Sequence, residues 1–337
     1  MQIQKNISIK QFNTFGVDVK ANLFVELKNE NFLNELFSSV NEIPNRFILG
    51  GGSNVLFTKD FNGIIIKNLL PGIEKIGEDN NFVFIKTGAG VNWHKLVKYS
   101  IKNNYWGIEN LSLIPGTVGA APIQNIGAYG QELKNVFHQL ETFDLQNNQF
   151  KTFAKDECKF GYRDSIFKKE FKNRFLITSV TLKLSKKEDA ILTYQPVKEE
   201  IDRLKINKPS ISQISNIICN IRRSKLPDPN KLGNAGSFFK NPEITEKKYL
   251  ALKKANNDIK GFKTENNKYK ISAGWLIEKC GWKGKRVGDV SSFEKQALVL
   301  VNVGKATGKD ILDFAESIKE IVKVKFGIEL KEEINIV

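Results

Sequence analysis

The hydrophobic and polar positions in the N-terminal part of the chain change repeatedly between the two-residue period of strands and the longer period of helices. Asn147-Asn148 separates two alternating runs, which is a hairpin signal. We predict strands at 21–27, 46–50, 63–68, 81–88 and 175–184, a hairpin over 140–153, and helices at 31–40 and 91–103. Strands and helices mixed in this way are typical of α/β and α+β domains.

The C-terminal part has its own pattern. Residues 211–225 predict a helix that ends before Pro227, and apolar residues at helical spacing follow Thr307. Residues 186–210 are charged and contain two prolines, so we expect a linker or excursion there. We predict a further helix at 244–256, a buried strand at 296–302 and a closing strand at 327–337.

The chain has 337 residues, more than one hydrophobic core usually serves, so two or three domains are expected. The pattern divides it into blocks 1–69, 70–205 and 206–337, with the excursion near 190–205. No apolar run is long enough to span a membrane, and the N-terminus lacks the features of a signal peptide. We therefore expect a cytoplasmic protein with no membrane insertion.

The charge balance is 52 − 37 = +15. Such an excess can indicate a nucleic-acid partner, small anionic ligands, or only a lysine-rich composition. The basic residues are spread along the chain among acidic ones, so we expect no nucleic-acid partner. Three widely spaced cysteines form neither a disulfide framework nor a metal motif, and only two histidines are present. The sequence therefore has few residues for metal-dependent catalysis or for a Ser-His-Asp triad, and no metal is expected.

Two glycine-rich segments could carry chemistry. Gly50, Gly51 and Gly52, followed by Ser53 and Asn54, form either a backbone nest for phosphate or a tight hairpin turn. Residues 115–130 contain four glycines, and such loops inside a folded block more often bind ligands than connect elements. The two segments together suggest a cofactor with a pyrophosphate and a flat ring.

Single polar residues leave alternatives open. Arg163 could bind a carboxylate or form a structural ion pair, and Lys225 could contact phosphate or complement a helix dipole. Ser237 follows a glycine, as turn residues often do, but a hydroxyl can also protonate a carbanion. In the closing alternation Glu332 falls on the apolar side and Glu333 on the other, which does not decide between them.

Motifs along nearly the whole chain resemble the UDP-N-acetylenolpyruvoylglucosamine reductase family. They occur in family order as LGGGSNVLF, PGTVGAAPIQNIGAYGQEL, FGYRDSIFK, LTYQPV, RRSKLPDP, GNAGSFFKNP, QALVLVN and GIELKEE. The combination of GYRDSIF with GNAGSFFKNP is highly specific, and LTYQPV makes the chain similar to the longer (type I) subtype.

The resemblance implies an α+β fold. Residues 1–69 and 70–205 would form a two-subdomain FAD-binding module of the vanillyl-alcohol-oxidase (PCMH) type, and 206–337 an α+β substrate-binding domain. FAD would be non-covalent, because the glycine turn offers no histidine for attachment. The expected cofactor contacts are Gly50, Gly51, Gly52, Ser53, Asn54, Gly116, Gly119, Ala120, Asn125, Ile126, Tyr129 and Arg222.

The resemblance also implies the reaction. NADPH would reduce FAD, and UDP-N-acetylglucosamine enolpyruvate would then be reduced to UDP-N-acetylmuramate for peptidoglycan. The expected catalytic residues are Arg163 and Glu333, at the substrate carboxylate, and Ser237, as proton donor to the carbanion. The nucleotide-diphosphate part of the substrate would meet Tyr194, Lys225, Asn241 and Gln296. A monomer is expected by the same analogy.

The chain departs from the family pattern in two places. Ala120 stands where many members have serine, so one hydroxyl near the flavin is absent. The closing segment reads Lys331-Glu332-Glu333 where members often have Glu-Pro-Glu, and ungapped alignment selects Glu333. Two alternatives to the reductase are a flavin oxidase or dehydrogenase for another substrate and a nucleic-acid-binding protein. Bound flavin in the purified protein would exclude the second.

Overall fold

The chain builds two structural units from segments that alternate along the sequence. The computed structural model describes residues 2–40, 42–264 and 266–337. The first unit contains the residues up to Ile7 together with Ala21–Gly51 and Phe61–Ser224, and the second contains Ser8–Lys20, Gly52–Asp60 and Lys225–Val337. The three-domain division expected from the sequence stays a prediction.

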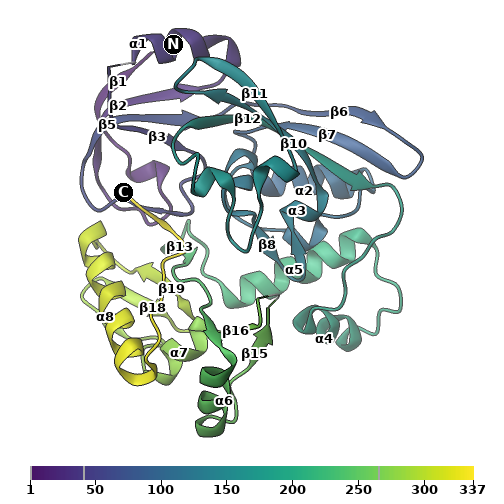
Figure 1. Cartoon of the computed structure of the whole chain (residues 1–337), viewed down its shortest axis with the longest axis vertical. Coiled ribbons are helices and arrows are strands. Elements are labelled where there is room, and N and C mark those ends of the chain that lie inside the picture. Colours follow the sequence, from purple (N-terminus) through teal and green to yellow (C-terminus); the bar gives the residue numbers. More distant parts are fainter. Residues whose placement is uncertain (1, 41, 265) are drawn as a thin grey trace. The chain divides into compact units, whose positions relative to one another are not determined.

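Two sheets form the framework of the first unit (Figure 1). One has the strand order β1-β2-β5-β3, in which β5 pairs in parallel with both β2 and β3. The other has the order β11-β10-β12-β7-β6 and is antiparallel throughout. Their strands are β1 (Gln4–Ser8), β2 (Lys20–Leu27), β3 (Arg46–Leu49), β5 (Phe61–Asn68), β6 (Ile73–Glu78), β7 (Phe82–Gly88), β10 (Phe137–Asp144), β11 (Gln149–Ala154) and β12 (Phe175–Ser185).

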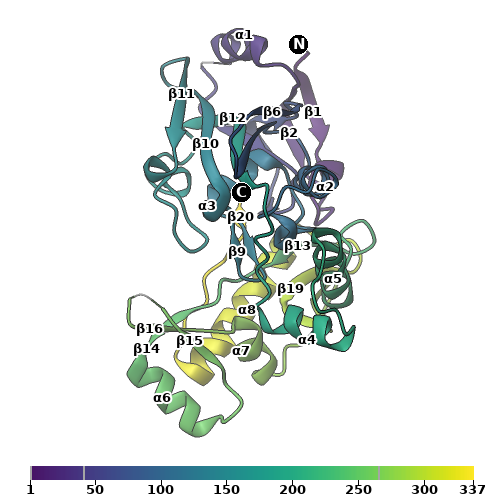
Figure 2. The ribbon, with the colours of Figure 1, turned by 90° about the vertical axis from the view of Figure 1, so that its right-hand side faces the viewer.

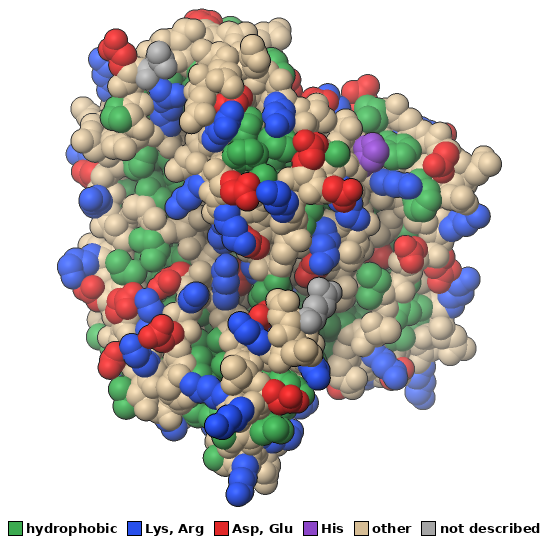
Figure 3. Space-filling view, in the orientation of Figure 1, with side chains coloured by type: hydrophobic (Ala, Val, Ile, Leu, Met, Phe, Trp, Pro, Cys, Tyr) green, Lys and Arg blue, Asp and Glu red, His purple; other side chains and the backbone are tan. Residues whose placement is uncertain are grey.

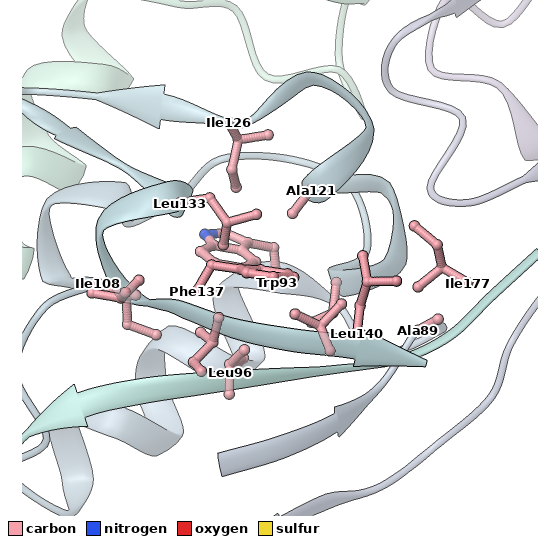
Figure 4. Packing of buried hydrophobic residues seen from close by; sticks show 14 of the residues in the cluster. Ala89, Trp93, Leu96, Ile108, Ala121, Ile126, Leu133, Phe137, Leu140 and Ile177 are labelled. Carbon is pink, nitrogen blue, oxygen red and sulfur yellow. The ribbon is translucent and has the colours of Figure 1, made fainter. Parts of the chain in front are cut away.

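A hydrophobic core joins the antiparallel sheet to α2 (Trp93–Lys102) and to α3 (Leu133–Val136). Trp93, the first residue of α2, lies among Leu133, Phe137 and Ile108 (Figure 4). Its indole Nε1 donates to the Leu111 carbonyl at 3.0 Å, which satisfies the one polar atom of this buried ring. The remaining elements of this unit are α1 (Leu33–Ser39), α4 (Gln195–Arg203), α5 (Ile211–Lys225), β8 (Gly127–Ala128) and β9 (Gln131–Glu132).

The second unit contains an antiparallel sheet with the order β13-β19-β18-β17 and a small sheet with the order β14-β16-β15. In both ribbon views α6 lies beside the small sheet (Figures 1 and 2). The elements are β4 (Val55–Leu56), β13 (Gly233–Ser237), β14 (Glu243–Thr245), α6 (Glu246–Ala255), β15 (Gly261–Lys263), β16 (Lys268–Ile271), α7 (Ala273–Lys279), β17 (Arg286–Val287), β18 (Val290–Phe293), β19 (Gln296–Asn302), α8 (Gly308–Phe326) and β20 (Asn335–Ile336).

Local signals explain where α8 begins. Thr307 is its N-cap, and the side chains of Thr307 and Asp310 form a reciprocal capping box. The buried face of the helix includes Ile311, Phe314 and Ile318, at the spacing that the sequence predicts. The predicted helices at 91–103, 211–225 and 244–256, the hairpin around Asn147-Asn148 and the strand at 296–302 are likewise confirmed.

Two local predictions need correction. The charged segment 186–210 contains the helix α4, and Pro196 lies in the first turn of this helix. A proline is tolerated there because the N–H that it lacks would have no partner within the helix. The closing segment is not one strand over 327–337, because only Asn335–Ile336 pair in β20, in parallel with β4. Ile336 is accordingly exposed, although it shares the predicted apolar side with Ile328.

The charges on the protein surface are mixed. Lysine and arginine side chains are interspersed with aspartate and glutamate on the face drawn in Figure 3. Within residues 2–40, 42–264 and 266–337, none of the helices combines the length and apolar character that crossing a membrane requires.

Candidate functional site

The first glycine turn lies tightly against the second glycine-rich loop. A Cβ atom added at Gly51 would lie 2.7 Å from the Gly116 Cα, and one at Gly50 would lie 2.6 Å from the Thr117 Oγ1. Only glycine permits two backbones to approach this closely. The turn therefore brings the backbone of Gly50 and Gly51 directly against the loop 115–120. Gly52, Ser53 and Asn54 follow in the second unit.

Asn125 holds the rest of this loop in shape. It adopts a left-handed φ of 44°, and its side-chain Nδ2 donates to the Gly161 carbonyl at 3.0 Å. Its Oδ1 accepts the Lys134 N–H at 3.0 Å. These bonds fasten the loop to the segment that carries Arg163. The contacts to FAD expected from Asn125, Ile126, Gly119 and Ala120 stay predictions.

Two buried polar atoms of the first unit belong to segments that the sequence predicts to bind FAD. Thr117 Oγ1 and Arg222 Nε are buried and have no hydrogen-bond partner among the described residues. Burial lowers the pKa of Arg222, and the charge of Arg163 adds to this effect, although the hydroxyl of Tyr129 opposes both. Burial also raises the pKa of Tyr129. A buried guanidinium close to a second one favours an anionic ligand.

These features fit FAD. Glycine turns such as Gly50-Gly51-Gly52 can present backbone N–H groups to a pyrophosphate, and the buried guanidinium of Arg222 offers a charged donor. Lys67 was not singled out from the sequence, yet its Nζ donates to the Gly50 carbonyl, and burial lowers its pKa. The available signal was a lysine that interrupts the apolar run of β5 in register with Leu49, the residue before the turn. Thr117 was also missed.

Arg163 occupies a strained position. It has a left-handed φ of 52°, in a turn closed by a hydrogen bond from the Gly161 N–H to the Asp164 carbonyl at 3.0 Å. Its Nη2 donates to the Gly127 carbonyl at 2.7 Å. A left-handed residue other than glycine costs about 1–3 kcal/mol and persists where the surroundings fix it, often at functional sites.

Two of the predicted substrate contacts lie at helix ends. Tyr194 is the N-cap residue of α4, is 44% exposed, and places its ring edge-on to Tyr129 with 5.4 Å between the ring centroids. Lys225 is the last residue of α5 and is exposed. Both side chains are available for contact.

A β-bulge presents Ser237 in the second unit. The register between β13 and β19 shifts between Asn234 and Ser237, and Gly236 has a φ of 70°. The Gly236 N–H donates to the Asn234 side chain at 3.0 Å, which fixes the bulge. Bulges of this kind re-aim a side chain and are frequent next to active sites. Ser237 is thus part of a built feature of the strand.

The closing segment runs alongside Ser237. The Glu333 N–H donates to the carbonyl of Phe238, the next residue after Ser237, at 2.8 Å. Glu332 points elsewhere, because its Oε1 accepts from Lys319 Nζ on α8 at 2.8 Å. The structure therefore brings Glu333 to the strand end that carries Ser237 and binds Glu332 in an ion pair.

Asn241 and Gln296 meet the same helix start. The Asn241 Oδ1 accepts the Ala273 N–H at 3.0 Å, at the first residue of α7. Gln296 opens β19, and its Oε1 lies 3.0 Å from the Cβ position of Gly274. The second unit thus gathers Ser237, Glu333, Asn241 and Gln296, while the first contains Arg163, Tyr129, Tyr194 and Arg222.

The glycine cradle, meaning Gly50 and Gly51 packed against the loop 115–120, lies in the part of the chain that is similar to flavin-binding proteins. Residues 22–149 match the family model described as an FAD binding domain, and residues 228–337 match that of the UDP-N-acetylenolpyruvoylglucosamine reductase C-terminal domain. The UDP-N-acetylenolpyruvoylglucosamine reductases of Flavobacterium johnsoniae and Pseudomonas savastanoi are each 44% identical to all of this chain, which covers 100% and 99% of their lengths.

A solved structure agrees with these relatives. That of UDP-N-acetylenolpyruvylglucosamine reductase (MurB) from Thermus caldophilus superposes with a TM-score of 0.68 at 25% identity, over 100% of this chain and 99% of that one. The chain belongs to the UDP-N-acetylenolpyruvoylglucosamine reductase family. The predicted resemblance and the α+β fold, with an FAD-binding module and a C-terminal domain, are confirmed.

Proposed function

We propose that this chain reduces UDP-N-acetylglucosamine enolpyruvate to UDP-N-acetylmuramate, a step of peptidoglycan synthesis, with FAD as cofactor and NADPH as reductant. Relatives that match it over their whole length are named as reductases of this substrate. The observation that carries the proposal is the β-bulge that presents Ser237 beside the closing segment, where Glu333 is hydrogen-bonded to Phe238 and Glu332 is bound by Lys319.

Bound FAD supplies two-electron redox chemistry between NADPH and the enolpyruvyl double bond. Gly50 and Gly51 would hold its pyrophosphate through backbone N–H groups, and Arg222 would supply a buried positive charge. The other expected contacts are Gly52, Ser53, Asn54, Gly116, Gly119, Ala120, Asn125, Ile126 and Tyr129. No side chain at the turn Gly50–Asn54 can attach the flavin covalently, so FAD is held non-covalently.

Arg163 and Glu333 act at the carboxylate end of the substrate. Reduction of the vinyl group places negative charge on the carbon next to the carboxylate, and a guanidinium stabilises that charge electrostatically. Glu333 reaches this end of the substrate from the closing segment, which is hydrogen-bonded to the Phe238 carbonyl.

Ser237 gives its hydroxyl proton to this carbon. A serine needs no lowered pKa for this step, because the carbanion that takes the proton is far more basic than the serine alkoxide that remains. Tyr194, Lys225, Asn241 and Gln296 bind the nucleotide-diphosphate part of the substrate. The Asn241 side-chain Oδ1 accepts a hydrogen bond from the Ala273 N–H, so its Nδ2 is the group that can donate to the substrate.

Replacement of Ser237 by alanine separates the two half-reactions. We expect NADPH to bleach the flavin at the wild-type rate, since that step needs no proton donor to carbon. Re-oxidation by the enolpyruvyl substrate slows by about 10²–10³ or more, the typical cost of one oriented donor. Stopped-flow absorbance of the flavin measures both steps, with Ser317→Ala on the exposed face of α8 as the matched control. Equal losses in both half-reactions contradict the proposed role.

The two neighbouring glutamates give a second test. Glu333→Gln slows re-oxidation far more than Glu332→Gln, because Glu332 is bound to Lys319 and only Glu333 is assigned to the substrate. Glu332→Gln removes a partly buried ion pair and costs about 1 kcal/mol of stability. The reverse order of the two re-oxidation rates would overturn the assignment.

We also propose that the protein works as a monomer in the cytoplasm, where UDP-sugars and NADPH are available. Light scattering coupled to gel filtration tests the first statement against the chain mass of 38.2 kDa. Reduction with NADPH and with NADH, compared at equal concentrations, tests the choice of reductant.

A further inference from the structure

A basic cavity lies between two helices of the first unit. On α2, His94, Lys98 and Lys102 follow one another at four-residue intervals and so share one side of the helix. Arg223 on α5 faces them, together with the polar side chains of Ser212 and Asn216. The cavity has a volume of about 390 Å³, and all its lining residues belong to the first unit.

The positive charge of this cavity is not neutralised. Lys98, Lys102 and Arg223 line it, and no aspartate or glutamate does. Among the described residues, none of these three cations has a carboxylate within ion-pair distance. Like charges at four-residue spacing destabilise a helix, so the arrangement has a cost that an anionic ligand would offset.

His94 adds a neutral donor. Its Nδ1 accepts the Leu113 N–H at 3.0 Å, so the neutral ring carries its proton on Nε2. Burial, followed by the charges of Lys98, Arg223 and Arg222, lowers the pKa of His94 and keeps it in this form. The cavity therefore combines three cations with imidazole, hydroxyl and amide groups.

We propose that this cavity between α2 and α5 binds a small phosphorylated molecule. Arginine and lysine together with hydroxyl and amide donors are the groups that recognise phosphate oxygens. The volume exceeds that of a phosphate group, and Ile101 and Cys219 supply apolar contact for a small organic remainder. None of the residues assigned above to FAD or to the substrate lines it.

Histidine NMR of the FAD-loaded protein provides the test. The chain has only two histidines, and the second, His138, lies outside the cavity on β10. The centroid of its ring is 4.9 Å from that of Phe84. Pyrophosphate and glycerol phosphate are titrated in turn at constant ionic strength, kept with sodium chloride. We expect a saturable shift of the His94 imidazole resonances and none of His138. Equal shifts of both histidines, or a His94 shift that sodium chloride alone reproduces, overturn the proposal.

Charge-removing variants locate the binding. Arg223→Gln and Lys98→Gln each weaken pyrophosphate binding about tenfold or more, since each removes one charge-assisted contact. Lys95→Gln is the matched control, because Lys95 is an exposed lysine of the same helix that does not line the cavity. It changes the affinity less than about twofold. An equal loss in all three variants means diffuse attraction to a basic surface and refutes the site.

Discussion

Gly51→Ala tests the cradle most directly. The added Cβ would lie 2.7 Å from the Gly116 Cα and 3.2 Å from its carbonyl carbon, so backbone would meet backbone. Carbon atoms pack at about 3.5–4.0 Å, so the turn and the loop must separate by roughly 1 Å. Overpacking of this kind costs about 1–3 kcal/mol. If FAD binds only the closely packed form of the turn and the loop, this cost corresponds to a loss of FAD affinity between about fivefold and more than a hundredfold.

Gly77→Ala is the matched control for this variant. Gly77 lies in β6 of the same unit, has no left-handed φ, and no atom lies within 4 Å of its Cβ position. Apoprotein of each variant is titrated with FAD, and quenching of the flavin fluorescence gives the dissociation constant. Wild-type affinity in Gly51→Ala would refute the close approach as a feature of the cofactor site. A similar loss in Gly77→Ala would show that the loss is not specific to the cradle.

Three further predictions concern stability. Burial raises the pKa of Glu109 above its ordinary value of 4.5, so its contribution to folding falls as pH rises from that value through the folded pKa, and the Tm of Glu109→Gln relative to wild type rises over the same interval. Trp93→Phe removes the indole bond to Leu111 and leaves a cavity, which lowers the free energy of unfolding by about 1–3 kcal/mol, seen as a lower urea midpoint at unchanged slope. Asn241→Ala removes the bond to the Ala273 N–H and costs about 1 kcal/mol by the same measurement.

The periodicity of the sequence predicted the elements that carry regularly spaced apolar residues on one face. The helix that buries Trp93 and the capped helix after Thr307 follow from local spacing and capping, which the sequence displays directly. The helix α4 was missed because charged residues and Pro196 resemble a linker, although a proline in the first turn is compatible with a helix. Its inner face, Val197 and Ile201, gives only two buried positions.

Structural features that depend on residues far away in the sequence could not be predicted from local patterns. The alternation of the closing segment suggested a long strand, but residues far away in sequence supply its partners, as when the Phe238 carbonyl accepts the Glu333 N–H. The same contact distinguishes the position of Glu333 from that of Glu332, which the alternation of apolar and polar residues could not do. Lys67 and Thr117 were overlooked because a lysine in a strand and a threonine in a loop carry no signal until the fold buries them.

The interleaving of the two units has a consequence for biosynthesis. Residues 8–20 and 52–60 leave the ribosome early, but their unit is completed only by residues 225–337. Val55 and Leu56 pair with Asn335–Ile336, which are made much later, and Thr14 exchanges hydrogen bonds with Asn234. At about 5–20 residues per second, these early segments wait on the order of ten seconds or more. During that time Phe15 and Phe57 are without the core that later buries them, so a ribosome stalled after residue 224 leaves a chain prone to aggregate.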